Sequence, residues 1–147
     1  CYALRDLAER YSAVNIIYPV HLNPNVRRPV DKILTKVKNV YLIEPQDYLI
    51  FIKLMDISYL ILTDSGGIQE EAPSLGKPVL VMRDSSERPE AVDKGTVRLV
   101  GANRKKIVDS VGELISDDNL YKEMSKIDNP YGDGKAAEKI LHILNKI

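Results

Sequence analysis

The clearest candidate for a chemical site lies in the stretch 60–71, LILTDSGGIQEE. An apolar, strand-like run ends at Thr63, two glycines follow Ser65, and a helical pattern begins after them. The first amides of a helix have no partners inside the helix, and together with the helix dipole they attract an anion. Gly66 and Gly67 would let a phosphate approach the backbone closely, while Ser65 could cap the helix or donate its hydroxyl to a phosphate oxygen. The stretch therefore indicates a phosphate site.

Glu71 follows Gly67 by four residues, which places it one turn into the helix and on the same face. A phosphate would repel its carboxylate, but a ribose diol beside the phosphate could donate two hydrogen bonds to it. A phosphate at the helix end with an acid on the sugar is typical of nucleotide binding. The alternative is a plain glycine turn with a serine cap and a solvated Glu71, and the motif alone leaves both open. Because the pattern is neither GxGxxG nor a P-loop, it does not indicate NAD or ATP.

A second candidate is the charged loop 83–90, RDSSERPE, which also follows an apolar run. Arg88 could bind a diphosphate through two parallel hydrogen bonds, and Arg83 is a weaker candidate for the same role. The alternative is a solvated loop whose charges pair among themselves, and the residues alone favour that interpretation.

Gln46 and Phe51 form a third candidate, near the end of another apolar run. Phe51 could sit against a nucleobase, while Gln46 and the backbone of the loop 44–47 would read the edge of the base. The alternative makes Phe51 a core residue of a helix over 48–55, and for one aromatic residue at helical spacing this is the safer interpretation.

His21 follows a strand-like run and could act as an acid, a base or a phosphate donor. A histidine in such a place is more often a structural hydrogen-bonding residue. The single cysteine, Cys1, excludes an internal disulfide and a cysteine-based zinc site, and two histidines are too few for a histidine-rich metal centre. No metal site is therefore predicted.

The elements that would position these residues alternate along the chain. The strand predictions are 14–20, 40–43, 59–63, 79–82 and 96–100, and the helix predictions are 2–11, 29–34, 48–55, 68–75, 103–115, 118–124 and 135–147. Continuous apolar strands that alternate with helices predict an α/β fold, a Rossmann-like parallel sheet with helices on both faces. No linker divides the chain, so residues 1–147 are predicted to form a single domain. Ligands of such sheets bind beyond the carboxyl ends of the strands, where all the candidate residues lie.

Composition narrows the class of protein further. The 147 residues include 21 Lys and Arg and 21 Asp and Glu. This neutral balance argues against nucleic acid and anionic membranes as partners. No apolar run approaches the roughly 20 residues of a membrane span, and no signal peptide is evident, so we expect a soluble cytoplasmic protein. Because helix-like sequence begins almost directly at Cys1, we expect a fragment of a longer chain.

With these segments identified, the chain resembles the C-terminal half of the non-hydrolysing UDP-N-acetylglucosamine 2-epimerases. The resemblance runs in order along nearly the whole chain. The matching stretches are 21–26 (HLNPNV), 63–73 (TDSGGIQEEAP), 76–80 (GKPVL), 87–92 (ERPEAV), 95–101 (GTVRLVG) and 129–134 (NPYGDG). Together they are far more specific than any one alone.

The resemblance implies the C-terminal domain of a GT-B fold, in which two Rossmann-like halves close over a UDP-sugar. The family interconverts UDP-GlcNAc and UDP-ManNAc by eliminating UDP and adding it back with inversion at carbon 2. It needs no redox cofactor, and it implies a role in polysaccharide biosynthesis. Carried over by residue, the resemblance implies a UDP site in which Gln46 and Phe51 lie at the uridine, Ser65, Gly66 and Gly67 at the diphosphate, Glu71 at the ribose and Arg88 near the diphosphate.

The chain departs from the family in one large respect. The family's acid and base carboxylates, its basic N-terminal nucleotide contacts and a histidine-bearing motif all lie upstream of this chain. We therefore expect a half-domain that binds a UDP-sugar but is inactive alone, and His21 is its one candidate catalytic residue. Its expected partners are the missing N-terminal domain and, in the full-length protein, a second copy in a homodimer. Two alternatives are half of a UDP-sugar glycosyltransferase and a stand-alone nucleotide-binding module.

Overall fold

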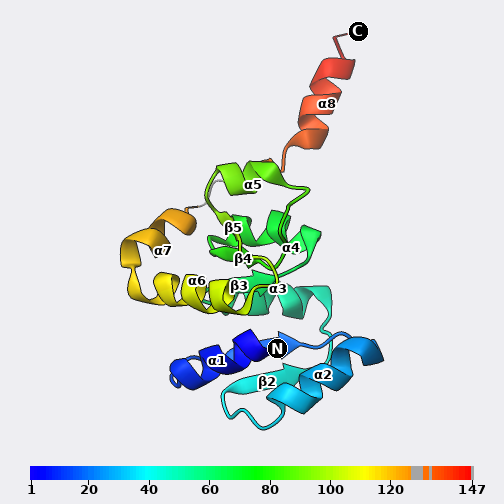
Figure 1. Ribbon diagram of the computed structural model, residues 1–147. Coiled ribbons are helices and arrows are strands. Elements are labelled where there is room, and N and C mark those ends of the chain that lie inside the picture. The colour runs from blue at the N-terminus through cyan, green and yellow to red at the C-terminus, as the bar shows by residue number, and fades with distance from the viewer. Residues whose placement is uncertain (127–130, 133, 147) are drawn as a thin grey trace.

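The computed structural model describes residues 1–126, 131–132 and 134–146. Strands and helices alternate, as predicted (Figure 1). The strands are β1 (Ile16–Pro19), β2 (Val40–Ile43), β3 (Ile61–Thr63), β4 (Val79–Val81) and β5 (Val97–Leu99). The helices are α1 (Tyr2–Arg10), α2 (Pro24–Leu34), α3 (Tyr48–Ile57), α4 (Gly66–Glu71), the 3₁₀ helix η1 (Ala72–Leu75), α5 (Pro89–Asp93), α6 (Arg104–Ser116), α7 (Asp118–Met124) and α8 (Ala136–Leu144). Asn129, Pro130 and Asp133 of the predicted turn, and Ile147 of the last predicted helix, lie outside the described residues.

All the described strand pairs are parallel, which confirms the predicted fold class. The strands form two hydrogen-bonded ladders, β1–β2 and β3–β4–β5, instead of the one continuous sheet that we expected. In Figure 1, β2 lies with α1 and α2 in the lower part of the molecule, and β3, β4 and β5 lie above them. Strands β1 and β3 do not pair with each other. Residues of both strands line an apolar slot.

Strand β4 shows that helices cover both faces of the larger ladder. Its three residues are fully buried, and successive side chains point to opposite faces. Leu80 packs into a cluster that includes α1 and α6, whereas Val79 and Val81 pack into a cluster with residues of α3, η1 and α5. A third apolar cluster joins α1 and α2 to β1 and β2. The continuous apolar runs in the sequence reflect this burial on two faces.

Local sequence signals explain most of the element boundaries. Asn103 caps α6 by accepting a hydrogen bond of 3.0 Å from the Lys106 amide. Gly76 adopts a φ of 64° and ends η1, which agrees with the end of the predicted helix 68–75. The start of α2 is a correction, because we expected a helix only from Pro29 to Leu34. Instead α2 begins at Pro24, where Asn23 caps it by accepting from the Asn25 amide at 2.9 Å.

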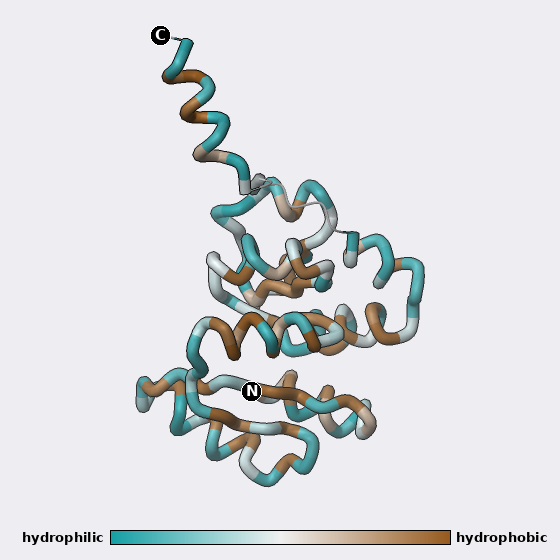
Figure 2. The backbone as a smooth tube through the Cα atoms, turned by 180° about the vertical axis from the view of Figure 1, so that it is seen from behind, coloured by the Kyte–Doolittle hydropathy of each residue, from teal (hydrophilic) through white to brown (hydrophobic). Residues whose placement is uncertain are grey.

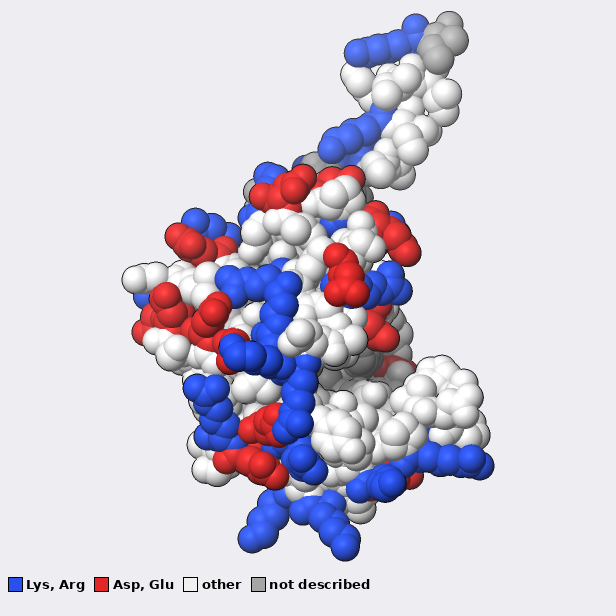
Figure 3. All heavy atoms as spheres, viewed as in Figure 1, with Lys and Arg blue, Asp and Glu red and all other residues white. Residues whose placement is uncertain are grey.

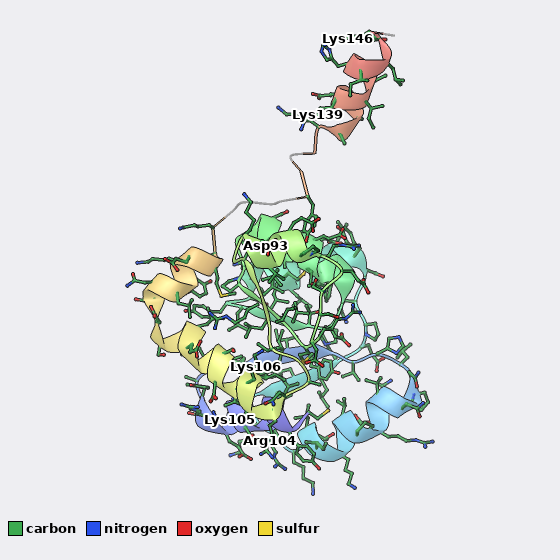
Figure 4. The ribbon with its side chains drawn as sticks, turned by 45° about the horizontal axis from the view of Figure 1, so that its top comes forward. Asp93, Arg104, Lys105, Lys106, Lys139 and Lys146 are labelled. Atoms are coloured by element: carbon green, nitrogen blue, oxygen red, sulfur yellow. The ribbon has the colours of Figure 1, made fainter. Side chains whose placement is uncertain are left out.

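Helix α8 projects away from the body of the molecule in Figures 1 and 4. Figure 2 shows that hydrophobic and hydrophilic residues alternate along it. Four large apolar residues on it are more than half exposed, namely Ile140, Leu141, Ile143 and Leu144. Over the described residues, none of the helices has the length and apolar character needed to span a bilayer.

Candidate functional site

The candidate residues lie in loops that leave the carboxyl ends of parallel strands. Because β3 and β4 pair in register, the turn 64–67 after β3 and the loop 83–88 after β4 leave the same edge of one ladder. The loops 20–23 after β1 and 44–47 after β2 leave the corresponding edge of the other ladder. The fold therefore brings the predicted residues of each ladder to one edge, where ligands of such sheets bind.

The turn before α4 is exposed at Ser65 and Gly67, and the Ser65 amide donates to Thr63 Oγ1 at 3.1 Å. Ser65 occupies the N-cap position but makes no capping hydrogen bond with its side chain, so its hydroxyl is not used to close the helix. Neither Gly66 nor Gly67 has a positive φ. A Cβ would meet only Glu87 Oε2 at 3.9 Å from position 66, and Ser65 Oγ at 4.0 Å from position 67. The fold therefore does not require glycine at position 66 or 67. The two glycines leave open space over the N-terminus of α4.

Gln69 ties this turn to the loop that carries Arg88. Its side chain is only 1% exposed. The Gln69 amide nitrogen donates to the Ser65 carbonyl at 3.2 Å, and its side-chain oxygen accepts from Ser86 Oγ at 2.6 Å. Ser86 Oγ in turn accepts from the Arg88 backbone N–H at 2.9 Å. This partly buried set of hydrogen bonds, the Gln69 relay, holds the glycine turn and the Arg88 loop together. Sequence reasoning missed it, although an amide side chain between the apolar Ile68 and Ala72 was a signal.

Arg88 lies beside α4 but already has a partner. Its Nε forms an ion pair with Glu70, and Nη1 donates to the Glu87 carbonyl at 3.2 Å. The hydrogen bond from the guanidinium to Glu70 raises the pKa of Arg88. Arg83 Nη1 pairs with Glu87 at 3.4 Å. The Arg83–Glu87 pair lies within the loop, as the alternative interpretation expected, whereas Arg88 pairs outside the loop with Glu70 of α4. A diphosphate would have to share Arg88 with Glu70 or displace it.

Glu71 is held by a residue that the sequence analysis did not single out. Tyr48, the first residue of α3, donates from Oη to Glu71 Oε2 at 2.9 Å. The hydrogen bond to this carboxylate and its negative charge raise the pKa of the Tyr48 phenol. Tyr48 comes directly after the loop 44–47 that carries Gln46, so the bond joins the proposed uridine side of the site to the proposed ribose carboxylate. The only feature of the sequence that could have drawn attention to Tyr48 was its position directly after Asp47, where α3 starts.

Gln46 and Phe51 lie on either side of the start of α3. The Gln46 side-chain amide donates to the Glu44 carbonyl at 2.7 Å, within its own loop. Phe51 is half-buried and packs against the apolar cluster around Met55 and Ala72. The core interpretation of Phe51 therefore holds for the side of the ring that packs inward.

His21 is exposed, and its Nδ1 accepts from the Asn23 amide at 3.1 Å. This bond lies within the turn that starts α2 and is the structural role that the sequence favoured. The described residues hold no group of three or more His, Cys, Asp and Glu side chains arranged to bind a metal ion.

Charged side chains of both signs are interspersed on the face shown in Figure 3. The basic residues Arg104, Lys105 and Lys106 lie together at the start of α6 (Figure 4). Arg104 donates two hydrogen bonds, of 2.5 and 2.6 Å, to Asp6, and Lys105 donates to Asp109 at 2.6 Å. Two of the three cations thus have carboxylate partners.

Parallel strands between two helical layers, with an open helix N-terminus at the carboxyl edge, define a Rossmann-like α/β protein with a candidate anion site. The sequence model of the family "UDP-N-acetylglucosamine 2-epimerase" matches residues 1–145, and the chain belongs to that family. This confirms the resemblance that the sequence motifs carried.

Individual relatives agree with the family match. The chain is 62% identical over 144 residues to UDP-N-acetylglucosamine 2-epimerase of Escherichia coli, and the aligned stretch covers 98% of this chain and 38% of the relative. It is similar to the crystal structure of the Neisseria meningitidis UDP-GlcNAc 2-epimerase bound to UDP-GlcNAc, with a TM-score of 0.93, 53% identity, and coverage of 99% of this chain and 39% of that one. For the Methanocaldococcus jannaschii enzyme in complex with UDP-GlcNAc and UDP, the TM-score is 0.79 at 35% identity, with coverage of 99% of this chain and 39% of that one. The chain thus spans about two-fifths of the length of these relatives.

Proposed function

We propose that this chain is the UDP-binding half of a UDP-N-acetylglucosamine 2-epimerase, which as a full-length protein interconverts UDP-GlcNAc and UDP-ManNAc. Family membership supports the proposal, as do two similar structures whose names include UDP-GlcNAc. The observation that carries it is the placement of the open Ser65-Gly66-Gly67 turn beside Arg88, with Glu71 one turn further along the chain.

Each part of UDP has a complementary group in this arrangement. The amides of Gly66 and Gly67, the Ser65 hydroxyl and the Arg88 guanidinium would bind the diphosphate. Glu71 would accept hydrogen bonds from the ribose diol, since a carboxylate is an acceptor only. Gln46 and the exposed side of Phe51 would contact the uracil. On binding, Arg88 would exchange part of its contact with Glu70 for contact with phosphate.

The chemistry of epimerisation needs more than this chain supplies. Removal of the proton on carbon 2 needs a base, and its return on the opposite face needs an acid. Three glutamates around the site already have partners, because Glu70 pairs with Arg88, Glu71 accepts from Tyr48, and Glu87 pairs with Arg83. We therefore propose that this half binds the substrate and that catalysis needs the N-terminal domain present in the longer relatives.

The remaining features of the full-length protein rest on the family resemblance alone. We propose that it needs no cofactor, forms a homodimer and acts in the cytoplasm in polysaccharide biosynthesis. Because the relatives compared above are all 2-epimerases by name, no observation favours half of a glycosyltransferase or a stand-alone module.

Titration of the chain with UDP, followed by amide NMR shifts, tests the site. With half of the closing surface absent, we expect a Kd on the order of 0.1–1 mM and shifts concentrated in residues 65–71. The same titration of the full-length protein should give a lower Kd. If millimolar UDP shifts no amide of residues 65–71 in either protein, the proposed site is wrong.

A further inference from the structure

Two successive residues of α4 hold Arg88 in two different ways. Gln69 holds the backbone of its loop, because the Gln69 side-chain oxygen accepts from Ser86 Oγ at 2.6 Å and Ser86 Oγ accepts from the Arg88 backbone N–H at 2.9 Å. Glu70 holds the side chain, because its carboxylate forms an ion pair with Arg88 Nε. Different partners therefore fix the backbone and the guanidinium, and the guanidinium can change its partner while the loop stays in place.

Glu70 also lies close to the turn at which the diphosphate is proposed to bind. It follows Gly66 by four residues on α4, so the two residues share one face of the helix and lie one turn, about 5.4 Å, apart. Side chains on a helix lean toward its N-terminus, which directs the Glu70 carboxylate toward the Ser65-Gly66-Gly67 turn. The guanidinium paired with Glu70 is thus within a side-chain rotation of a phosphate at that turn.

Acidic residues outnumber basic ones in the two loops that form this part of the site. Segments 64–71 and 83–90 contain three acidic residues each, whereas their only basic residues are Arg83 and Arg88. Arg83 pairs with Glu87, whose side chain is 72% exposed, and Arg88 pairs with Glu70, whose side chain is 38% exposed. Water and salt screen the less exposed pair less. A diphosphate therefore meets its stronger competitor at Arg88.

We infer that Glu70 is a positioning residue that competes with the diphosphate for the Arg88 guanidinium and thereby limits the affinity of the site for UDP. The inference rests on the proposed function, because it takes the diphosphate to lie at the Ser65-Gly66-Gly67 turn. In the free protein Glu70 keeps the guanidinium beside α4. In the complex a phosphate replaces part of that contact, so some of the energy of the phosphate contact is spent in breaking the ion pair. A ligand without phosphate does not take part in this exchange.

A competing role and a purely structural role predict opposite effects when the charge of Glu70 is removed. If Glu70 only supported the fold of the loop, its replacement would weaken the binding of every uridine ligand. If Glu70 competes with phosphate, its replacement strengthens the binding of UDP and leaves the binding of uridine unchanged. The loop should keep its place in the variant, because the Gln69 relay holds its backbone.

The test is the variant Glu70→Gln in the full-length protein, titrated calorimetrically with UDP and with uridine. Glutamine keeps the shape and an acceptor oxygen but carries no charge. The Kd of UDP should fall about two- to fivefold, the scale of a partly exposed ion pair, and the Kd of uridine should not change. The control Glu113→Gln removes another glutamate–arginine pair, with Arg98 at 2.7 Å, and should leave both values unchanged. An equal or higher Kd of UDP in Glu70→Gln would overturn the inference.

A double-mutant cycle shows whether the gain in affinity depends on Arg88. In the Arg88→Ala background, Glu70→Gln should lose most of its effect on the Kd of UDP. A full gain without Arg88 would mean that Glu70 repels the phosphate directly, which contradicts competition for the guanidinium. If UDP binds the unchanged protein and shifts the amides of residues 65–71, but Glu70→Gln gives no gain, only the inference is wrong. If UDP shifts none of these amides, the proposed function is wrong and the inference falls with it.

Discussion

Tyr48 Oη donates a hydrogen bond of 2.9 Å to Glu71 Oε2, and this bond joins the first turn of α3 to the last turn of α4. It uses one carboxylate oxygen and leaves Oε1 outside the bond. A carboxylate that is fixed at one oxygen loses rotational freedom before a ligand arrives, so less entropy is lost when it binds. Two predictions follow from this arrangement, one for each partner.

Replacement of Glu71 by alanine should weaken UDP binding in the full-length protein. If the carboxylate accepts the ribose hydroxyls, the loss should be roughly 1.5–3 kcal/mol, the range for hydrogen bonds to charged groups. Stability should change little, because Glu71 is only half-buried. Calorimetric titration measures the change, and Glu9→Ala on the far helix α1 is the control. Equal UDP affinity in the Glu71→Ala variant and the unchanged protein would show that Glu71 does not bind the ribose.

Replacement of Tyr48 by phenylalanine should reduce the preference for ribose over deoxyribose. The variant keeps the ring but removes the donor that orients Glu71, so the affinity for UDP should fall about fivefold, near 1 kcal/mol. The affinity for 2′-deoxy-UDP should barely change, because one ribose hydroxyl is already absent. Tyr41→Phe, at an exposed position on β2, is the control. An equal loss for both nucleotides would show that Tyr48 acts on the fold rather than on Glu71.

Replacement of the buried Gln69 by leucine should destabilise the protein and loosen the site. The change removes the donor to the Ser65 carbonyl and the acceptor for the Ser86 hydroxyl proton, which costs about 1–3 kcal/mol of unfolding free energy. Urea unfolding measures it, and Gln46→Leu should have a much smaller effect, because Gln46 bonds only its own loop. Adding Ser86→Ala to Gln69→Leu should cost less than the sum of the two single changes. Strict additivity would mean that the relay does not couple the two loops.

The ion pair between Asp6 and Arg104 should make stability sensitive to acid. The hydrogen bond from Arg104 lowers the pKa of Asp6, so this pair stabilises the fold above the unfolded-state pKa of about 3.9 and is lost as the pH falls through the lower folded-state pKa. Asp6→Asn should therefore lower the melting temperature at pH 7 and have less effect near pH 2. Asp56→Asn, which removes a pair inside one helix, should have a smaller effect at pH 7. An equal effect of Asp6→Asn at both pH values would contradict this role.

Features set by neighbouring residues could be predicted from the sequence. The apolar strands, the cap at Asn103, the stop at Gly76 and the open turn at Ser65 all depend on residues within a few positions. The start of α2 at Pro24 was missed because the Asn-Pro-Asn sequence fits both a turn and a capped helix start.

The contacts that shape the candidate site join residues far apart in the sequence, and these were not predictable. Ser86 lies 17 positions from Gln69, Arg88 lies 18 from Glu70, and Tyr48 lies 23 from Glu71. No local pattern specifies which side chains of three different loops and helices will meet. The separation of the strands into two ladders was equally hidden, since no local pattern in the sequence specifies which strands pair.

The short chain alone should not exchange the hydrogen on carbon 2 of UDP-GlcNAc with solvent. A positioned base or acid contributes about 10²- to 10⁴-fold each, and Glu70, Glu71 and Glu87 of the site already have partners. His21 is a further candidate, but it is exposed, and its Nδ1 accepts a hydrogen bond from the Asn23 amide. NMR of UDP-GlcNAc in deuterated water measures the exchange, with the full-length protein as the positive control. Deuterium at carbon 2 in the presence of the short chain, lost in His21→Ala, would place proton transfer in this half. Exchange that survives His21→Ala would instead assign proton transfer to another group of this half, such as a carboxylate in the loops after β3 and β4.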